Sequence, residues 1–117
     1  MRTVEQLKAR RAILVGALKR VRKGWTRYVL AIDRNNHRVL PIDRNTVCWC
    51  ASGALIASGR LPDHPGDLME DSYHKICVWN DKATRTQDDV IAAFEAAIQQ
   101  TDDEIATATA AAKRGEA

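Results

Sequence analysis

Three cysteines and one histidine supply the residue types of a zinc site. Cys48 and Cys50 are separated by one residue, and His74 precedes Cys77 by three. Structural zinc takes four such ligands, which must converge on the ion at ~2.0–2.3 Å. Side chains two apart on a helix point in nearly opposite directions, so Cys48 and Cys50 could share one ion only if a helix began after Cys50. We favour buried structural cysteines and expect neither a metal nor another cofactor.

The same residues allow a second chemistry, that of a cysteine hydrolase. Cys50 would be the nucleophile, His74 the base, and Asn80 or Asp81 the group that orients the base. Reactive cysteines usually lie partly exposed at the N-terminus of a helix, where the thiolate is favoured. The helix expected around Cys50 places it a turn or more inside, so this hydrolase stays the least favoured alternative.

Residues 46–59 are predicted to form the central helix. Apolar or small side chains occur on every side of this stretch, which is typical of a helix that is buried all round. Gly53 lets another segment approach closely. Asp43 or Asn45 can cap the start, and Gly59 can close the end.

Two further helices are bounded by clear signals. Residues 4–23 carry an apolar stripe with lysines and arginines away from it, and Gly24 ends the pattern. Thr86 and Asp89 resemble a capping box in front of a long final helix, whose apolar positions continue to Ile105. Beyond that point the Ala-rich residues 106–117 have little to bury, and we expect them to fray.

Shorter elements connect these helices. Residues 28–32 and 39–42 are predicted to pair as a small hairpin or extended loop within 27–42, with Asn35 and Asn36 in the turn. Residues 60–67 contain two prolines and a glycine and predict a loop. A short helix is expected over 68–76, followed by a turn at Asn80 and Asp81 with Trp79 folded back onto the core.

Length and composition fit a single mainly α (α+β) domain. The chain has 117 residues, of which 45% are hydrophobic and 28% charged, within the range of globular proteins. We expect one helical domain of about four helices over 1–105 and a tail over 106–117. The start of the sequence lacks the apolar region of a secretory signal and no run is long enough to cross a membrane, which predicts a cytoplasmic location.

Charge is divided unequally between the two parts of the chain. Residues 1–45 carry twelve Lys or Arg against three Asp or Glu, whereas residues 46–117 carry six against twelve. The basic part could pair with the acidic part, or it could face an acidic partner. Nucleic acid is one such partner, with Trp25 and Tyr28 available for stacking and a basic set to contact phosphates: Lys8, Arg11, Lys19, Arg20, Arg22, Lys23 and Arg27.

Trp79, Asn80 and Asp81 offer a ring, an amide and a carboxylate at one predicted corner. These groups could bind a ligand, because function is enriched on loops. They could equally satisfy neighbouring backbone groups and cap the next element. We favour the structural interpretation.

The pattern of tryptophans and small residues resembles a known domain family. Trp49-Cys50 with Gly53-Ala54-Leu55, then Trp79-Asn80-Asp81 and Thr86, is similar to a small family of unknown function found in bacterial and bacteriophage genomes. The resemblance covers roughly residues 5–100 and implies a mainly helical fold. It supplies no catalytic residue, and Cys48, His74 and Cys77 have no counterpart in the family pattern.

The function we predict is that of a non-enzymatic helical interaction module. It would bind a protein partner as a bacterial or phage accessory protein or inhibitor, with nucleic-acid binding as the alternative. The residues we expect to bind are Trp25, Arg27, Lys19, Arg20, Lys23, Trp79, Asn80 and Asp81. The identity of the partner and the oligomeric state stay open.

Overall fold

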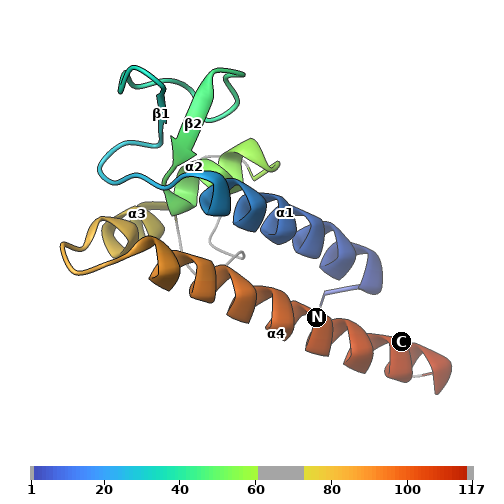
Figure 1. Cartoon of the computed structure of the whole chain (residues 1–117). Coiled ribbons are helices and arrows are strands. Elements are labelled where there is room, and N and C mark those ends of the chain that lie inside the picture. Colours follow the sequence, from blue (N-terminus) through green and yellow to red (C-terminus); the bar gives the residue numbers. More distant parts are fainter. Residues whose placement is uncertain (1, 61–72, 116–117) are drawn as a thin grey trace.

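The computed structural model of the chain describes residues 2–60 and 73–115, which form four helices and one two-stranded sheet (Figure 1). The mainly α fold with a small β element, predicted from the sequence, is confirmed. The elements in order are α1 (Val4–Lys23), β1 (Ala31–Asp33), β2 (Thr46–Trp49), α2 (Ala51–Ala57), α3 (Tyr73–Asp81) and α4 (Gln87–Lys113). In the part of the chain so described, no helix is both long and apolar enough to cross a membrane.

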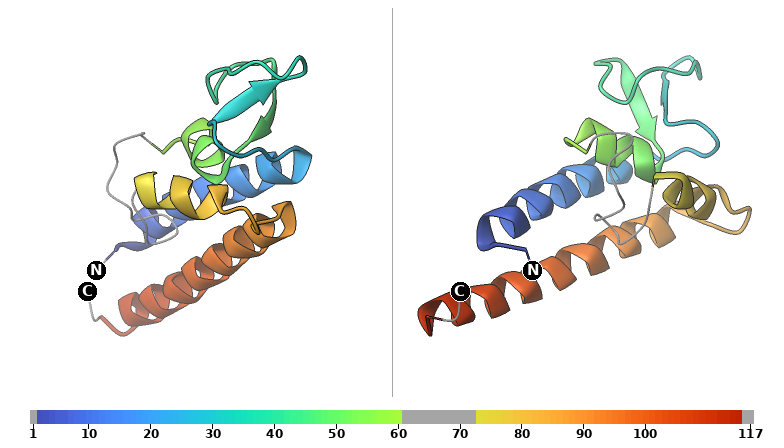
Figure 2. Two further views of the ribbon diagram at one scale, coloured as in Figure 1. Left: turned by 90° about the vertical axis from the view of Figure 1, so that its left-hand side faces the viewer. Right: turned by 180° about the vertical axis from the view of Figure 1, so that it is seen from behind.

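The two long helices, α1 and α4, lie side by side and run in opposite directions (Figures 1 and 2). Thr3 caps α1 in a capping box with Gln6, and Thr86 caps α4 in the predicted box with Asp89. Each helix has an apolar stripe that faces the core, as the helical spacing of its apolar residues predicted. The buried side chains of these stripes are Leu7, Leu14, Ala17, Leu18 and Val21 on α1 and Val90, Phe94 and Ala97 on α4.

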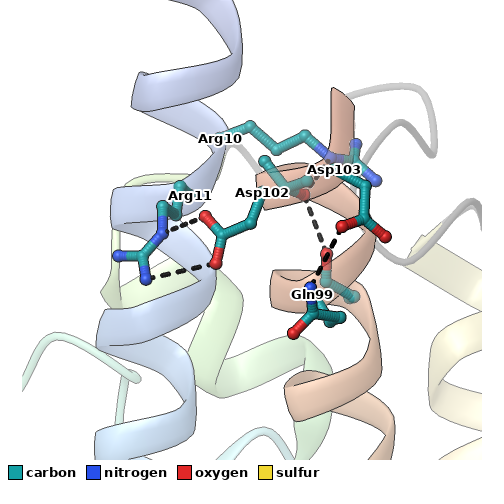
Figure 3. Close-up of polar contacts among 7 residues, drawn as sticks. Arg10, Arg11, Gln99, Asp102 and Asp103 are labelled. Atoms are coloured by element: carbon teal, nitrogen blue, oxygen red, sulfur yellow. Dashed lines mark hydrogen bonds and ion pairs between the residues drawn. The ribbon is translucent and has the colours of Figure 1, made fainter. Parts of the chain in front are cut away.

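Arginines of α1 pair with acidic residues of α4 along this contact. Arg11 Nε lies 2.6 Å from Asp102 Oδ1 (Figure 3), and Arg22 Nη2 lies 3.3 Å from Glu95 Oε2. Such exposed pairs contribute at most about 1 kcal/mol each. At these positions, positive charge from the basic N-terminal part of the chain is neutralised by carboxylates of the acidic C-terminal part.

Residues 46–59 do not form the single central helix that was predicted. Thr46–Trp49 is the strand β2, Cys50 is the N-cap residue, and only the seven residues of α2 are helical. The cause is a long-range backbone pairing: Trp49 N donates to Gly24 O (3.0 Å), and Trp49 O accepts from Thr26 N (3.2 Å). β-branched and aromatic residues tolerate this extended pairing well, so tertiary contacts overrode the helical pattern.

The sheet also differs from the predicted hairpin. β1 pairs antiparallel with β2, with Ala31 opposite Trp49 and Ile32 opposite Cys48, and the expected partner segment contributes one backbone hydrogen bond, from Val39 N to Ala31 O (3.1 Å). The turn was placed correctly, because Asn36 has a positive φ of 66°. Residues 40–45 leave the sheet as a loop, after the Ile32–Arg38 bridge and the hydrogen bond from Val39 N to Ala31 O.

Helix α3 corrects the expected turn after residue 76. The helix includes Trp79, Asn80 and Asp81, which occupy its last turn instead of a separate corner. Residues 61–67 of the predicted loop and 68–72 of the predicted short helix lie outside the described residues. Helix α4 continues past Ile105 to Lys113, and the division of the chain at residue 105 stays a prediction.

Gly53 allows the close approach that the sequence predicted. A Cβ at this position would lie 2.0 Å from the carbonyl oxygen of Leu30, a backbone atom that itself accepts from Cys50 N (3.1 Å). We expect Gly53→Ala to lower the free energy of unfolding by about 1–3 kcal/mol, the usual cost of forced overpacking. Chemical denaturation measures this change.

Gly16→Ala is the matched control for this substitution. Its Cβ would meet side-chain atoms only, Ser58 Oγ at 3.0 Å and Arg20 Nη1 at 3.5 Å, and no backbone atom from another segment. Replacement of a mid-helix glycine by alanine gains up to ~1 kcal/mol, so little net change is expected. Equal losses of unfolding free energy in the two variants would show that contact with Leu30 is not the reason why position 53 requires glycine.

Candidate functional site

Asn80, on α3, is a fully buried polar side chain with every hydrogen-bonding group in use. Its Oδ1 accepts from Trp25 Nε1 (2.7 Å) and from the backbone N–H of Ala51 (2.9 Å). Its Nδ2 donates to Thr26 O (3.1 Å) and to Asp81 Oδ1 (3.0 Å). An amide has two donors and two acceptor sites, so no capacity is left for a ligand.

Its neighbours hold residues 25–28 against the end of α3. Asp81 Oδ1 accepts from Tyr28 N (2.8 Å), which supports the positive φ of 71° at Tyr28. The Arg27 guanidinium lies over the Trp25 ring at 4.8 Å and donates to the carbonyl of Arg85. These contacts assign Trp25, Arg27 and Asp81 to the support of the fold.

Trp79 is held in a similar way. The guanidinium of Arg85 lies 4.1 Å from the centre of the Trp79 ring, and Arg85 Nε donates to Trp79 O (3.0 Å). Five of the eight predicted binding residues, Trp25, Arg27, Trp79, Asn80 and Asp81, thus meet in one structural cluster.

The other three predicted binding residues, Lys19, Arg20 and Lys23, line a different surface. They border a groove of about 540 Å³ between the C-terminal part of α1 and the loop that enters β2. Arg20 is engaged, since its Nη1 donates to Ser58 Oγ (3.1 Å) and Gly16 O (3.3 Å). The loop side of this groove consists of Pro41, Ile42, Asp43, Arg44, Thr46 and Trp49, with Ala57 from α2.

Three cations of this groove stand apart from the internal ion pairs. Lys19, Lys23 and Arg44 are exposed, and within residues 2–60 and 73–115 their side chains form neither a salt bridge nor a hydrogen bond. Asp43 is the acidic residue of the lining, and its Oδ1 accepts from Asn45 N (2.7 Å). The groove therefore presents net positive charge.

Two large apolar side chains of this loop are exposed, and one of them, Ile42, lines the groove. Leu40 is 70% exposed and Ile42 is 72% exposed. Their loop is anchored through its backbone, because Thr46 Oγ1 donates to Leu40 O (3.1 Å) and Trp49 Nε1 donates to Pro41 O (2.9 Å). The sequence placed 39–42 in a strand and so missed Leu40, Ile42 and Arg44; the Pro41 that interrupts this apolar run was the available signal.

A second cavity contains two of the three cysteines. Its volume is about 360 Å³, and its lining includes Cys50 and Cys77 together with Tyr28, Val29, Leu30, Arg38, Val39 and Asp81. Cys50 is only 3% exposed, and its sulfur accepts from Gly53 N (3.2 Å). Cys77 is half-buried, with Sγ 3.4 Å from Ser52 Oγ.

The two thiols differ in pKa because each is the other's hydrogen-bond partner. The Cys50 thiol donates to the Cys77 sulfur and is buried, and both effects raise the pKa of Cys50. The bond from Cys50 lowers the pKa of Cys77 to about 6, against the opposing effect of burial and with further help from the Ser52 hydroxyl. Cys77 is thus the more nucleophilic sulfur at neutral pH.

The four-ligand and hydrolase arrangements find little support in this geometry. Cys48 lies on β2 beside Gly24, and a Cβ added at Gly24 would come within 2.8 Å of the Cys48 sulfur. In the described ranges no hydrogen bond joins Cys50 to the exposed His74, and no three His, Cys, Asp or Glu side chains gather as a metal site would require. Asn80, the expected orienting group, is already saturated by backbone and Trp25 contacts.

Comparison with known proteins gives one match. Residues 57–100 match a family of unknown function, DUF6197. The match runs from the end of α2 to the middle of α4, so it includes Trp79-Asn80-Asp81 and Thr86 but not Trp49-Cys50. No curated protein and no solved structure matches the chain.

Asn80→Ala is expected to destabilise the fold strongly. The change leaves the part-buried Trp25 Nε1 and the buried Ala51 N–H without their acceptor, and an unsatisfied buried group costs about 1–3 kcal/mol. We expect a loss of about 3 kcal/mol in the free energy of unfolding. The exposed Asn45→Ala serves as control and should stay within about 0.5 kcal/mol of the native value. A small loss at Asn80 would refute its structural assignment.

The pH dependence of cysteine alkylation tests the unequal thiols. Cys77 should react through a group of pKa about 6, so its alkylation rate should rise as the pH increases through 6 and level off above it. An ordinary thiol would show this rise near pH 8.5. Cys50 should stay nearly unlabelled in the native protein, because it is buried and its pKa is raised. Peptide mapping after short exposure to iodoacetamide gives both rates, and fast labelling of Cys50 would contradict the assignment.

Proposed function

We propose that this protein is a non-enzymatic interaction module whose groove between α1 and the 40–46 loop binds a protein partner. The partner segment would carry acidic residues and large apolar side chains. The observation that supports this most directly is the exposure of Ile42 (72%) in a groove lined by the unpaired Lys19, Lys23 and Arg44 of the described chain, with Leu40 (70% exposed) two residues before it in the same loop. Apolar anchors next to rim charges are the usual composition of a protein-binding surface.

Charge complementarity favours an acidic partner. Arg11 and Arg22 of α1 are neutralised by α4, yet Lys19 and Lys23 on the same helix face the groove instead. Three cations against Asp43 leave an excess of positive charge next to the apolar loop. A segment with carboxylates would gain from these charges in association rate and specificity.

The apolar loop favours a protein over a nucleic acid. Single-stranded nucleic acids stack their bases on exposed aromatic rings. The groove has one aromatic residue, Trp49, which is 8% exposed and donates its N–H to Pro41. Trp25, expected to stack, is occupied by Asn80 and Arg27, and the exposed Tyr28 lines the other cavity. Leu40 and Ile42 suit the side chains of a protein better.

A cytoplasmic role as a bacterial or phage accessory protein or inhibitor is part of this proposal. It is supported by the resemblance of the tryptophan and small-residue pattern to a family of such genomes. The three cysteines, which are free thiols in the structure, are consistent with a reducing compartment.

Selection from a display library of random peptides tests the proposed partner chemistry. Binders are selected on the intact chain and counter-selected on Leu40→Ser/Ile42→Ser, which alters two exposed side chains and should leave the fold unchanged. We expect the recovered peptides to combine Asp or Glu with Leu, Ile, Phe or Trp. Lys19→Glu/Lys23→Glu should weaken the best peptide by about tenfold or more, equal to ~1.4 kcal/mol.

Lys8→Glu/Lys82→Glu is the matched control, since it makes the same charge change at exposed positions away from the groove. Peptides without acidic enrichment, or equal loss in both charge variants, would contradict the proposal. A single-stranded DNA probe is measured in parallel. Its binding at physiological salt, tighter than about 1 μM and lost in Lys19→Glu/Lys23→Glu, would establish the nucleic-acid alternative, because non-specific binding is typically weaker.

A further inference from the structure

Cys50 and Cys77 meet in a cavity that the proposed function does not use. The two residues come from different elements, the cap of α2 and the middle of α3, yet both line the same cavity. We propose that this cavity is a thiol–disulfide exchange site that reacts with a small disulfide bearing carboxylates, such as glutathione disulfide. Cys77 is the attacking sulfur and Cys50 the resolving sulfur.

The difference in exposure gives each sulfur its role. Cys77 is half-buried at the cavity wall, so an incoming disulfide can reach it. Cys50 lines the same cavity but is only 3% exposed, so it can react with a sulfur bound to Cys77 but hardly with a free reagent. Attacking and resolving cysteines of dithiol sites show this same division.

The exchange balances in two steps. The Cys77 thiolate attacks one sulfur of the small disulfide, a Cys77–S–S–R bond forms, and the other half leaves as a thiolate. Cys50 then attacks the Cys77 sulfur, and the bond between that sulfur and the sulfur of the R–S group breaks. The proton of the Cys50 thiol ends on a departing thiolate. The protein dithiol loses two electrons to become the Cys50–Cys77 disulfide, and the small disulfide is reduced to two thiols.

The charged groups of the cavity favour an anionic reagent. Arg38 lines the cavity opposite α3, is exposed, and forms no side-chain bond or ion pair among the residues that the structure describes. The Asp81 carboxylate opposes the Cys77 thiolate, but it is occupied by Tyr28 N and Asn80 Nδ2. His74, one turn before Cys77 on α3, favours the thiolate. Among the residues that line the cavity, Arg38 is therefore the cation that can contact a carboxylate of the reagent.

Mass spectrometry of the full chain in a glutathione redox buffer at pH 7 tests the site. We expect an intramolecular disulfide between Cys50 and Cys77, identified by peptide mapping, with Cys48 left free. Cys50→Ser should trap glutathione on Cys77, because no resolving sulfur remains. Cys77→Ser should leave Cys50 unmodified, and the control Cys48→Ser should oxidise like the native chain. Native oxidation needs no variant, so the test holds even if a substitution unfolds the protein.

The reagent class is tested with Arg38→Ala. Its reaction with glutathione disulfide should be at least about fivefold slower, whereas the uncharged hydroxyethyl disulfide should react at the native rate. If Arg38→Ala changed the rate by the same factor with both reagents, the role of Arg38 would be overturned, and with it the preference for an anionic reagent. A disulfide that involves Cys48, or the absence of glutathione on Cys77 in Cys50→Ser, would overturn the exchange site itself.

Discussion

The hydrogen-bond set of Asn80 is the contact on which the remaining architecture depends. One buried amide joins α3 to the first backbone N–H of α2 and to Trp25 and Thr26, which follow α1. Because the amide itself is fully buried, its own polar atoms would be left without hydrogen bonds if these partners moved away. Three segments far apart in sequence are thereby held in one relative position, which places both the groove and the thiol cavity.

The sequence predicted the elements whose signals are local. Helix α1 ends at Gly24 as expected, and the Thr86 capping box begins α4, because caps and apolar periodicity act within a few residues. The split of 46–59 into β2 and α2 could not be predicted in this way. It results from the pairing of Trp49 with Gly24 and Thr26, which depends on where the chain returns in space.

The candidate site was predictable only in part, for the same reason. Lys19 and Lys23 were identified from charge, but the structure had to show that Arg11 and Arg22 of the same helix are paired with α4. Residues 38–45 were not recognised as a loop, because their apolar and β-branched side chains are typical of a strand. This segment supplies Arg38 to the thiol cavity and Ile42 to the groove. Both cavities thus take lining residues from this one segment.

The pairing of the first helix with the last has a consequence for how the chain acquires its structure. The buried Arg10 side chain donates to Thr101, 91 residues further along the chain. Contacts over such separations form late, since a long loop must close before they contribute. During synthesis α1 emerges before α4, so the contacts between these two helices form only once α4 has been made, whereas those with β2 and α2 can form earlier. The side of α1 that faces α4 is therefore the last part of the described core to be covered.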